Sequence, residues 1–284
     1  RLSGRRHHGC RGRWEAFYKL PGRCGGHPRT PNGGGPHGIR ATPVEQLTVS
    51  LSIVPRPKEK VCAVIVAAGR GERMGDMDKL FAPLAGEPVL SLTLRAFHTC
   101  PVIEEIVLVL NPHNLQRGRR LVEEQGWWKV MHICLGGERR QDSVREGLAR
   151  INGCDWVVIH DGARPLVSHQ LIMCGLQEAQ DRGAAVAAVP VKDTLKVVNP
   201  GLEVEETPNR STLWAVQTPQ VFRYQLIWDA YARSQAPASD DASLIERLGH
   251  RVKVYMGSYD NIKITTQEDL AIAEVLLQRK GPSQ

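Results

Sequence analysis

The stretch VCAVIVAAGRGERMGDMDK, residues Val61–Lys79, decides the fold class. Its first part, Val61–Ala68, is apolar throughout, which is typical of a strand buried on both faces of a parallel sheet. The loop after this strand begins with Gly69 and Gly71 and contains three basic residues, Arg70, Arg73 and Lys79. Glycines expose backbone N–H groups, and Arg and Lys carry positive charge, so such a loop is a place to hold phosphates. The stretch therefore predicts an α/β domain with a phosphate site after its first strand.

The glycine-rich loop matches neither of two well-known phosphate-binding motifs. Met74 stands where a dinucleotide fingerprint has its third glycine, and Gly75 is followed by Asp76 where a P-loop has Lys and then Ser or Thr. Taken alone, the loop fits a basic surface turn as well as it fits a phosphate site. Its assignment therefore depends on the rest of the chain.

Apolar runs and amphipathic segments alternate along the chain after Lys60. The apolar runs predict strands at Val61–Ala67, Ile106–Leu110, Val130–Cys134, Trp156–His160 and Ala184–Val189. The amphipathic segments predict helices at Val89–His98, Asn114–Gln125, Gln141–Arg150 and Ser168–Arg182. Continuous apolar runs are typical of strands buried on both faces, and the alternating order favours right-handed crossovers. We expect a Rossmann-like, doubly wound, mostly parallel sheet in one domain that spans residues 61–280.

Residues 191–213 interrupt this alternation. Thr194–Val198 and Leu202–Glu206 alternate polar and apolar residues around Asn199-Pro200-Gly201, which predicts a β-hairpin. A hairpin that projects from an α/β domain usually packs on something else, such as a second subunit. We therefore expect a protruding dimerisation arm at 191–213, and the alternative is a floppy surface hairpin.

The α/β pattern resumes after the hairpin. We expect strands at Leu213–Phe222 and Val252–Met256, an extended segment at Asn261–Thr265, and helices at Tyr224–Ser234, Ala242–Leu248 and Leu270–Arg279. Thr266 and Asp269 form a capping box, which predicts that the last helix opens there.

The composition indicates one globular core without a membrane span. Of the 284 residues, 42% are hydrophobic and 24% charged, which is ordinary for a globular protein, and no apolar run approaches the ~18 residues that a membrane helix needs. The net charge of +7 comes from residues 1–60, which hold 12 of the 37 Lys and Arg and 3 of the 30 Asp and Glu. The remaining 25 basic and 27 acidic residues give −2, so we expect neither nucleic acid nor a membrane as a partner.

Residues 1–60 are rich in Gly, Pro, Arg and His and lack hydrophobic periodicity. We expect a disordered basic tail, either a presequence or the product of a mis-set start. His7, Cys10, Cys24 and His27 are zinc ligands by type and number, but no strand or helix pattern surrounds them. A solvated tail is the favoured interpretation, and nucleic-acid binding by this tail is a weaker one.

The seven cysteines are odd in number and scattered along the chain. Several lie inside apolar strands, which does not fit a disulfide framework. We expect reduced thiols in a reducing compartment.

Further polar clusters fall near predicted strand ends, where ligands bind in open α/β sheets. GGERRQDS at 136–143 places glycines, an arginine and a serine at the start of a helix, which suits a base edge or a phosphate. HDGARP at 160–165 places Asp161 at a strand end, where a carboxylate is a natural Mg²⁺ ligand. A helix cap or a salt bridge with Arg164 is the alternative for Asp161. A last set, which together suits a second phosphate, consists of Arg210, Thr218 and Lys263.

These clusters together resemble one enzyme family. The segments are AAGRGERMG at 67–75, Asp78-Lys79, GGERRQDSV at 136–144, HDGARP at 160–165, VKDTLK at 191–196, LWAVQTPQVF at 213–222 and DNIKITT at 260–266. Their order and spacing are similar to those of the 2-C-methyl-D-erythritol 4-phosphate cytidylyltransferases, the CTP-dependent enzymes of the non-mevalonate isoprenoid pathway. The resemblance runs from about Val61 to Leu277 and implies a sugar nucleotidyltransferase fold.

The resemblance also implies roles for individual residues. The catalytic residues would be Arg73, Lys79, Arg210 and Lys263. The CTP-binding positions would be Ala67, Ala68, Gly69, Gly71, Gly137, Arg140, Ser143, Asp161 and Gly162. The positions around the methylerythritol phosphate would be Asp161, Arg164, Thr194, Arg210, Thr218, Ser239 and Lys263. Asp161 is also the expected ligand of Mg²⁺ or another divalent cation, and the arm is expected to clasp a second subunit in a homodimer with shared active sites.

The implied reaction transfers CMP from CTP to 2-C-methyl-D-erythritol 4-phosphate and releases pyrophosphate. The alternatives are a ribitol 5-phosphate cytidylyltransferase, whose motifs are nearly the same, and a non-catalytic nucleotide-binding module. Two departures from the family pattern are Asp78-Lys79-Leu80 where Pro-Lys-Gln is frequent, a form also similar to molybdopterin guanylyltransferases, and Gly162 where alanine or serine is usual. The expected location is the bacterial cytoplasm, or the plastid stroma if residues 1–60 are a transit peptide.

Overall fold

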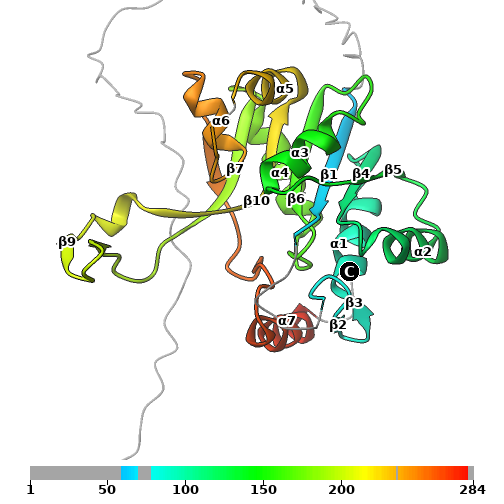
Figure 1. Cartoon of the computed structure of the whole chain (residues 1–284), viewed down its shortest axis with the longest axis horizontal. Coiled ribbons are helices and arrows are strands. Elements are labelled where there is room, and N and C mark those ends of the chain that lie inside the picture. The colour runs from blue at the N-terminus through cyan, green and yellow to red at the C-terminus, as the bar shows by residue number, and fades with distance from the viewer. Residues whose placement is uncertain (1–58, 70–77, 235, 281–284) are drawn as a thin grey trace, which may run out of the picture. The chain divides into compact units, whose positions relative to one another are not determined.

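The computed structural model of the chain describes residues 59–69, 78–234 and 236–280 (Figure 1). The predictions for residues 1–58, which include the basic tail and the zinc ligands considered there, lie outside these residues, as do Gly71 and Arg73. No helix within the described ranges is long and apolar enough to cross a membrane. The five cysteines in these ranges are free thiols, as expected: Cys62, Cys100, Cys134, Cys154 and Cys174.

A seven-stranded sheet forms the centre of the fold. In spatial order its strands are β11 (Lys253–Met256), β7 (Ala184–Pro190), β10 (Trp214–Arg223), β6 (Trp156–Asp161), β1 (Val61–Ala67), β4 (Glu105–Leu110) and β5 (Val130–Leu135). Neighbouring strands are parallel except at β10, which is antiparallel to both β6 and β7. The prediction of an α/β fold with a mostly parallel sheet is confirmed.

Helices cover both faces of this sheet. They are α1 (Val89–His98), α2 (Leu115–Gln125), α3 (Arg140–Leu148), α4 (His169–Ala179), α5 (Tyr224–Arg233), α6 (Ala242–Arg247) and α7 (Gln267–Lys280). Successive residues of a strand face opposite sides of the sheet. Accordingly, Ile65 of β1 lies in an apolar cluster with Leu94 of α1, whereas its neighbour Val64 lies in a second cluster with Leu148 of α3. The sheet is therefore doubly wound, as predicted.

The central position of β1 fixes where a ligand can bind. β1 is parallel to β4 on one side and to β6 on the other, with Ala67 opposite Leu110 and Val66 opposite Asp161. The carboxyl ends of these three strands consequently meet at one edge of the sheet. Ligands of open α/β sheets bind at that edge.

Three local features differ from the sequence-based expectation. β5 is not buried on both faces, because it is an edge strand with a neighbour on one side only, and Met131, for example, is exposed. The segment Asn261–Thr265 forms no strand. A short hairpin of β2 (Pro83–Leu84) and β3 (Glu87–Pro88) was not predicted. Its turn places Ala85 and Gly86 at positive φ, 51° and 85°, the conformation of a type I′ turn.

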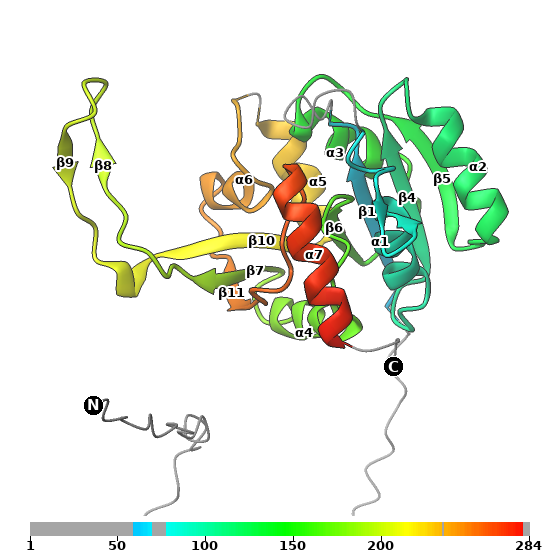
Figure 2. The same ribbon diagram turned by 90° about the horizontal axis from the view of Figure 1, so that it is seen from below.

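The predicted hairpin of the arm is present and projects away from the sheet (Figures 1 and 2). β8 (Val197–Val198) pairs antiparallel with β9 (Val204–Glu206). The Asn199 side chain closes the turn, since its Oδ1 accepts hydrogen bonds from the backbone N–H groups of Gly201 and Glu203 at 2.9 and 3.0 Å. A 3₁₀ turn, η2 (Arg210–Thr212), leads back to β10.

The capping box predicted for the last helix is also confirmed. The Asp269 carboxylate accepts a hydrogen bond from the Thr266 backbone N–H at 3.0 Å, and the Thr266 hydroxyl accepts one from the Asp269 N–H at 3.4 Å. These reciprocal bonds satisfy two donors that the start of a helix leaves without an intrahelical partner. The helix therefore begins at Gln267, directly after Thr266 of the capping box and three residues before the expected start at Leu270.

Candidate active site

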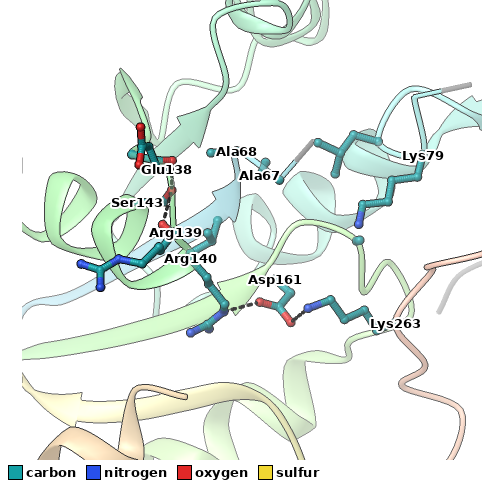
Figure 3. A pocket seen from close by; sticks show the side chains of 14 residues that line it. Ala67, Ala68, Lys79, Glu138, Arg139, Arg140, Ser143, Asp161 and Lys263 are labelled. Atoms are coloured by element: carbon teal, nitrogen blue, oxygen red, sulfur yellow. Dashed lines mark hydrogen bonds and ion pairs between the residues drawn. The ribbon is translucent and has the colours of Figure 1, made fainter. Parts of the chain in front are cut away.

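A cavity lies at the carboxyl ends of β1 and β6, beside the start of α3 (Figure 3). Nine of its lining residues were predicted from the sequence: Ala67, Ala68, Gly69, Lys79, Gly137, Arg140, Ser143, Asp161 and Lys263. They come from segments that are far apart in the chain, and the sheet topology brings them together. The cavity is the candidate site for CTP.

Close backbone packing shapes one wall of this cavity. A Cβ atom at Gly136 would lie 2.4 Å from the Cβ of Ala68 and 2.5 Å from the Oγ of Ser143. Only glycine fits there, so the turn between β5 and α3 can lie directly against the end of β1. The first turn of α3 then lines the cavity, and the N-terminus of a helix favours a bound anion.

Asp161 at the end of β6 is surrounded by three cations. Its Oδ1 lies 3.1 Å from Nε of Arg140, and its Oδ2 lies 2.9 Å from Nζ of Lys263 (Figure 3). Oδ2 also lies 3.6 Å from Nε of Arg164. Burial alone would raise the pKa of the Asp161 carboxyl, but Arg140, Lys263 and Arg164 outweigh it and hold that pKa below its usual range. Asp161 is therefore ionised at neutral pH, and the group as a whole is positive.

Arg140 has a second carboxylate partner, which the sequence did not suggest. Its Nη1 and Nη2 donate to the two oxygens of Asp241 at 3.0 and 2.8 Å, the bidentate geometry that suits a guanidinium and a carboxylate. Asp241 is 0% exposed and also accepts a hydrogen bond from the Tyr231 hydroxyl at 2.6 Å. Burial would lower the pKa of Arg140, but Asp241 and Asp161 raise it above its usual value. We call Asp161, Asp241, Arg140, Arg164 and Lys263 the Asp161 cluster.

Lys79 enters the cavity from the opposite wall. Its side chain comes from the segment that precedes α1 and points into the cavity (Figure 3). The residue before it, Asp78, accepts a hydrogen bond from the Asn114 side chain and another from the Leu80 backbone N–H at 2.9 Å. Asn111, in the same turn after β4, lies 3.5 Å from the carbonyl oxygen of Gly69. This turn thus fixes the position of Lys79 beside the end of β1.

A second cavity lies on the other side of the Asp161 cluster. Six of its lining residues belong to the predicted set: Arg140, Asp161, Arg164, Thr218, Ser239 and Lys263. The other six were not predicted: Val216, Gln217, Gln220, Asp240, Ser243 and Glu246. Arg140, Asp161 and Lys263 line both cavities. These three side chains therefore stand between two binding spaces.

Some predicted site residues lie elsewhere. Arg210 and Thr194 are exposed on the arm and line neither cavity, and the Arg210 guanidinium donates to the Lys192 carbonyl at 2.7 Å. Gly162 lies behind the cavity wall, where an added Cβ would come within 3.0 Å of the Ala67 Cβ. The structure does not test the roles assigned to these residues, which stay predictions.

The cluster does not by itself form a metal site. Within the described part of the chain, no group of three or more His, Cys, Asp or Glu side chains is placed to hold a metal ion. Both oxygens of Asp161 face cations. Mg²⁺ in proteins is usually held by one or two carboxylates together with substrate phosphates. The donor set thus does not fit a resident metal ion, and the expectation that Asp161 binds Mg²⁺ remains a prediction.

The sequence analysis assigns no site role to Asp241, His160 or Gln220. Asp241 lies near a predicted helix start, His160 belongs to a motif only by position, and Gln220 lies in a predicted strand. For His160, the available signal was a polar residue at the end of an otherwise apolar strand; Gln220 lies in a strand with other polar residues and had no such signal. Both are buried, at 0% and 1% exposure, and a buried polar side chain needs partners.

Comparison with known proteins identifies the family. Residues 61–279 match the family model described as IspD: 2-C-methyl-D-erythritol 4-phosphate cytidylyltransferase. The chain belongs to this family. It is 53% identical over 221 residues to the 2-C-methyl-D-erythritol 4-phosphate cytidylyltransferase of Dehalococcoides mccartyi strain 195, covering 78% of this chain and 97% of that protein. The enzyme of the same name from Alkaliphilus oremlandii is 45% identical, with 78% and 96% covered.

Solved structures of cytidylyltransferases share the fold. The 4-diphosphocytidyl-2C-methyl-D-erythritol synthase of Anaerococcus prevotii superposes with a TM-score of 0.70 at 33% identity, covering 78% of this chain and 97% of that one. The cytidylyltransferase of Thermus thermophilus superposes with a TM-score of 0.64 at 34% identity, covering 76% and 98%. The chain is accordingly a nucleotidyltransferase of the isoprenoid pathway, and the family predicted from the motifs is confirmed.

Proposed function

We propose that the two cavities bind CTP and 2-C-methyl-D-erythritol 4-phosphate, and that CMP is transferred between them beside the Asp161 cluster. The observation that carries this proposal is that Arg140, Asp161 and Lys263 line both cavities. Two anionic substrates that react with each other must bring their phosphates together at one place. A positive cluster shared by two cavities provides that place.

The reaction joins an oxygen of the methylerythritol phosphate to the α-phosphorus of CTP and breaks the bond from that phosphorus to the bridging oxygen of the β-phosphate. Pyrophosphate leaves, and 4-diphosphocytidyl-2-C-methyl-D-erythritol remains. A phosphate monoester is already ionised at neutral pH, so its oxygen needs no strong general base. Catalysis then depends on positioning and on neutralisation of charge.

The positive side chains supply both effects. Lys79 lies on the CTP side, where it stabilises charge that develops on the α-phosphate and on the leaving pyrophosphate. Arg164, which lines the second cavity, and Lys263, which lines both cavities, position the incoming phosphate. Asp161 keeps its three cationic partners in place, because each of them contacts it directly. The proposed role of Arg73, which lies outside the described residues, is the same as that of Lys79.

The divalent cation belongs to the nucleotide substrate in this proposal. Mg²⁺ is bound by the triphosphate oxygens and enters as the Mg–CTP complex. Its proposed function is to neutralise the triphosphate and to orient it. Asp161 is the proposed protein ligand nearest to that complex.

Arg210 and Thr194 act in this proposal through a homodimer. Both lie on the exposed arm, away from the cavities of their own chain. An arm that clasps a second subunit would carry them to the second cavity of that subunit. The apolar side chains exposed on and beside the arm support a role in contact: Leu195, Val197, Val198, Leu202, Val204, Trp214 and Val216. The proposed location of the dimer is the bacterial cytoplasm.

A pyrophosphate-release assay with CTP and each of two polyol phosphates tests the function. We expect turnover with 2-C-methyl-D-erythritol 4-phosphate and little with ribitol 5-phosphate. Preference for ribitol 5-phosphate would replace the proposed acceptor. CTP binding without release of pyrophosphate from CTP in the presence of either acceptor would mean that the chain is a non-catalytic nucleotide-binding module.

A further inference from the structure

His160 is a fully buried imidazole on β6, one residue before Asp161. It is 0% exposed, and its ring lies 5.0 Å from that of Phe97. Its Nε2 lies 3.1 Å from the backbone carbonyl oxygen of Arg164, and its Nδ1 lies 3.1 Å from the Thr218 hydroxyl. Both ring nitrogens therefore have a partner, as a buried polar side chain requires.

The chemistry of these partners fixes the direction of each hydrogen bond. A carbonyl oxygen can only accept, so Nε2 carries the proton and donates to Arg164. The ring is 0% exposed, and its two nitrogens face a carbonyl oxygen and a hydroxyl rather than a carboxylate, so burial favours the neutral imidazole. In a neutral imidazole the other nitrogen has no proton. The Thr218 hydroxyl must therefore donate to Nδ1.

The Thr218 oxygen has a second partner. It lies 3.1 Å from the backbone N–H of Asp161, which can only donate, so the Thr218 oxygen accepts this bond. This hydrogen bond takes the place of a backbone hydrogen bond that the sheet lacks at Asp161. The pairing of β10 with β6 ends at Gln220 opposite Ile159, and β10 is irregular between Val216 and Gln220. Without the hydroxyl, the Asp161 N–H would be buried without an acceptor, which costs free energy.

We infer that His160 and Thr218 are positioning residues, which form a directed chain from the Asp161 N–H through the Thr218 hydroxyl to the Arg164 carbonyl and hold the backbone of Asp161 in place. The hydroxyl proton of Thr218 points to His160 and not to a substrate phosphate. Thr218 is only 4% exposed, although it belongs to the wall of the second cavity. It therefore does not donate to the acceptor phosphate, which differs from the role that the family resemblance implies.

The first experiment does not depend on catalysis. In protein with ¹⁵N-labelled histidine, long-range ¹H–¹⁵N NMR spectra report which ring nitrogen is protonated. We expect the signals that disappear in His160→Gln to show protonated Nε2 and unprotonated Nδ1 at pH 7. A proton on Nδ1 would overturn the chain. Because this measurement needs no turnover, it holds even if the proposed function fails.

The second experiment rests on the proposed function and uses kinetics. Misplacement of a reacting group by about 1 Å can cost ~10²-fold in rate, so we expect Thr218→Val to lower kcat about 10- to 100-fold. The KM for the polyol phosphate should change less than about twofold, and Thr218→Ser, which keeps the hydroxyl, should restore kcat. A KM at least about tenfold higher with kcat retained would instead make Thr218 a substrate ligand.

Two substitutions of His160 separate its two bonds. In His160→Asn an amide oxygen can lie near the position of Nδ1 and so accept from Thr218, whereas in His160→Gln an amide N–H can lie near the position of Nε2. We expect His160→Asn to retain more kcat than His160→Gln. Equal kcat in the two variants would contradict the role of the Thr218 bond. Thermal unfolding verifies that each variant is folded. If the His160 variants do not fold, the comparison of Thr218→Val with Thr218→Ser tests the inference.

Discussion

The Asp161 cluster and the arm are built on opposite principles. Each ionised group of the cluster contacts at least one opposite charge, and its carboxylates are buried: Asp161 is 7% exposed and Asp241 0%. On the arm, Leu202 is 84% and Val204 57% exposed, and the hydrogen bonds that order the hairpin are its own. The cluster can be explained within one chain, whereas the apolar surface of the arm has no explanation until something covers it. Buried polar groups, as in the cluster, and exposed apolar patches, as on the arm, are the two departures from ordinary burial that indicate function.

Chelation of divalent cations is expected to have the largest effect, and it should affect the reaction beside the cluster and not the assembly through the arm. With excess EDTA we expect pyrophosphate release to fall to background, because the proposed substrate is Mg–CTP. Excess Mg²⁺ should restore it. The oligomeric state, measured by light scattering after size exclusion, should not change, because the arm has no part in metal binding. Full turnover in EDTA would remove the metal from the mechanism.

Lys79→Ala tests the positive charge that Lys79 supplies to the reaction. Loss of one group that stabilises transition-state charge commonly costs ~10²–10³ in kcat, and we expect a loss in that range with the fold intact. Lys253→Ala is a matched control, because Lys253 is exposed on β11 and lines neither cavity. Steady-state kinetics and circular dichroism of both variants provide the measurement. Near-normal kcat in Lys79→Ala would exclude it from the catalytic residues.

Lys79 is a residue that the sequence identified by its type, and the structure explains why the sequence could not identify every residue of the site. The apolar run of β1 and the glycines after it have strong local signals, so the cavity wall was predicted. The partner of Arg140 was not, because Asp241 is 101 residues away in the chain and local pattern carries no information on such pairs. The exposure of β5 was missed for a similar reason. β5 has the apolar composition of a central strand, and only the strand order shows that it lies at the edge of the sheet.

Asp241→Asn tests how strongly the buried part of the cluster stabilises the fold. The change leaves Arg140 without its bidentate partner, and breaking a buried ion pair by removing one member commonly costs about 3–5 kcal/mol. Because the Arg140 side chain is 29% exposed, we expect a loss at the lower end of that range, about 3 kcal/mol in the free energy of unfolding, measured with urea.

Glu87→Gln is the control for Asp241→Asn. Glu87 and Arg95 form an ion pair in which both side chains are more than a third exposed, 37% and 39%. Exposed pairs contribute about 0–1 kcal/mol, so the unfolding free energy of this variant should fall by less than about 1 kcal/mol. Equal losses in the two variants would mean that burial does not distinguish the cluster from a surface ion pair.

Val204→Lys should have the smallest effect on the stability of the single chain and a clear effect on its assembly. Val204 pairs with Val198 across the hairpin, so the two valines share a face, and both are exposed. Exposed substitutions usually change the unfolding free energy by no more than about 0.5 kcal/mol, and this should hold for the monomer. If the arm clasps a second subunit, a lysine on its apolar face should favour the monomer in size exclusion with light scattering. It should also lower kcat, because Arg210 would no longer reach the partner's cavity. Glu205→Lys places the same side chain on the opposite face and should leave the dimer intact. A monomer that retains full activity would show that the site is complete within one chain, and the apolar face of the arm would then need a different partner.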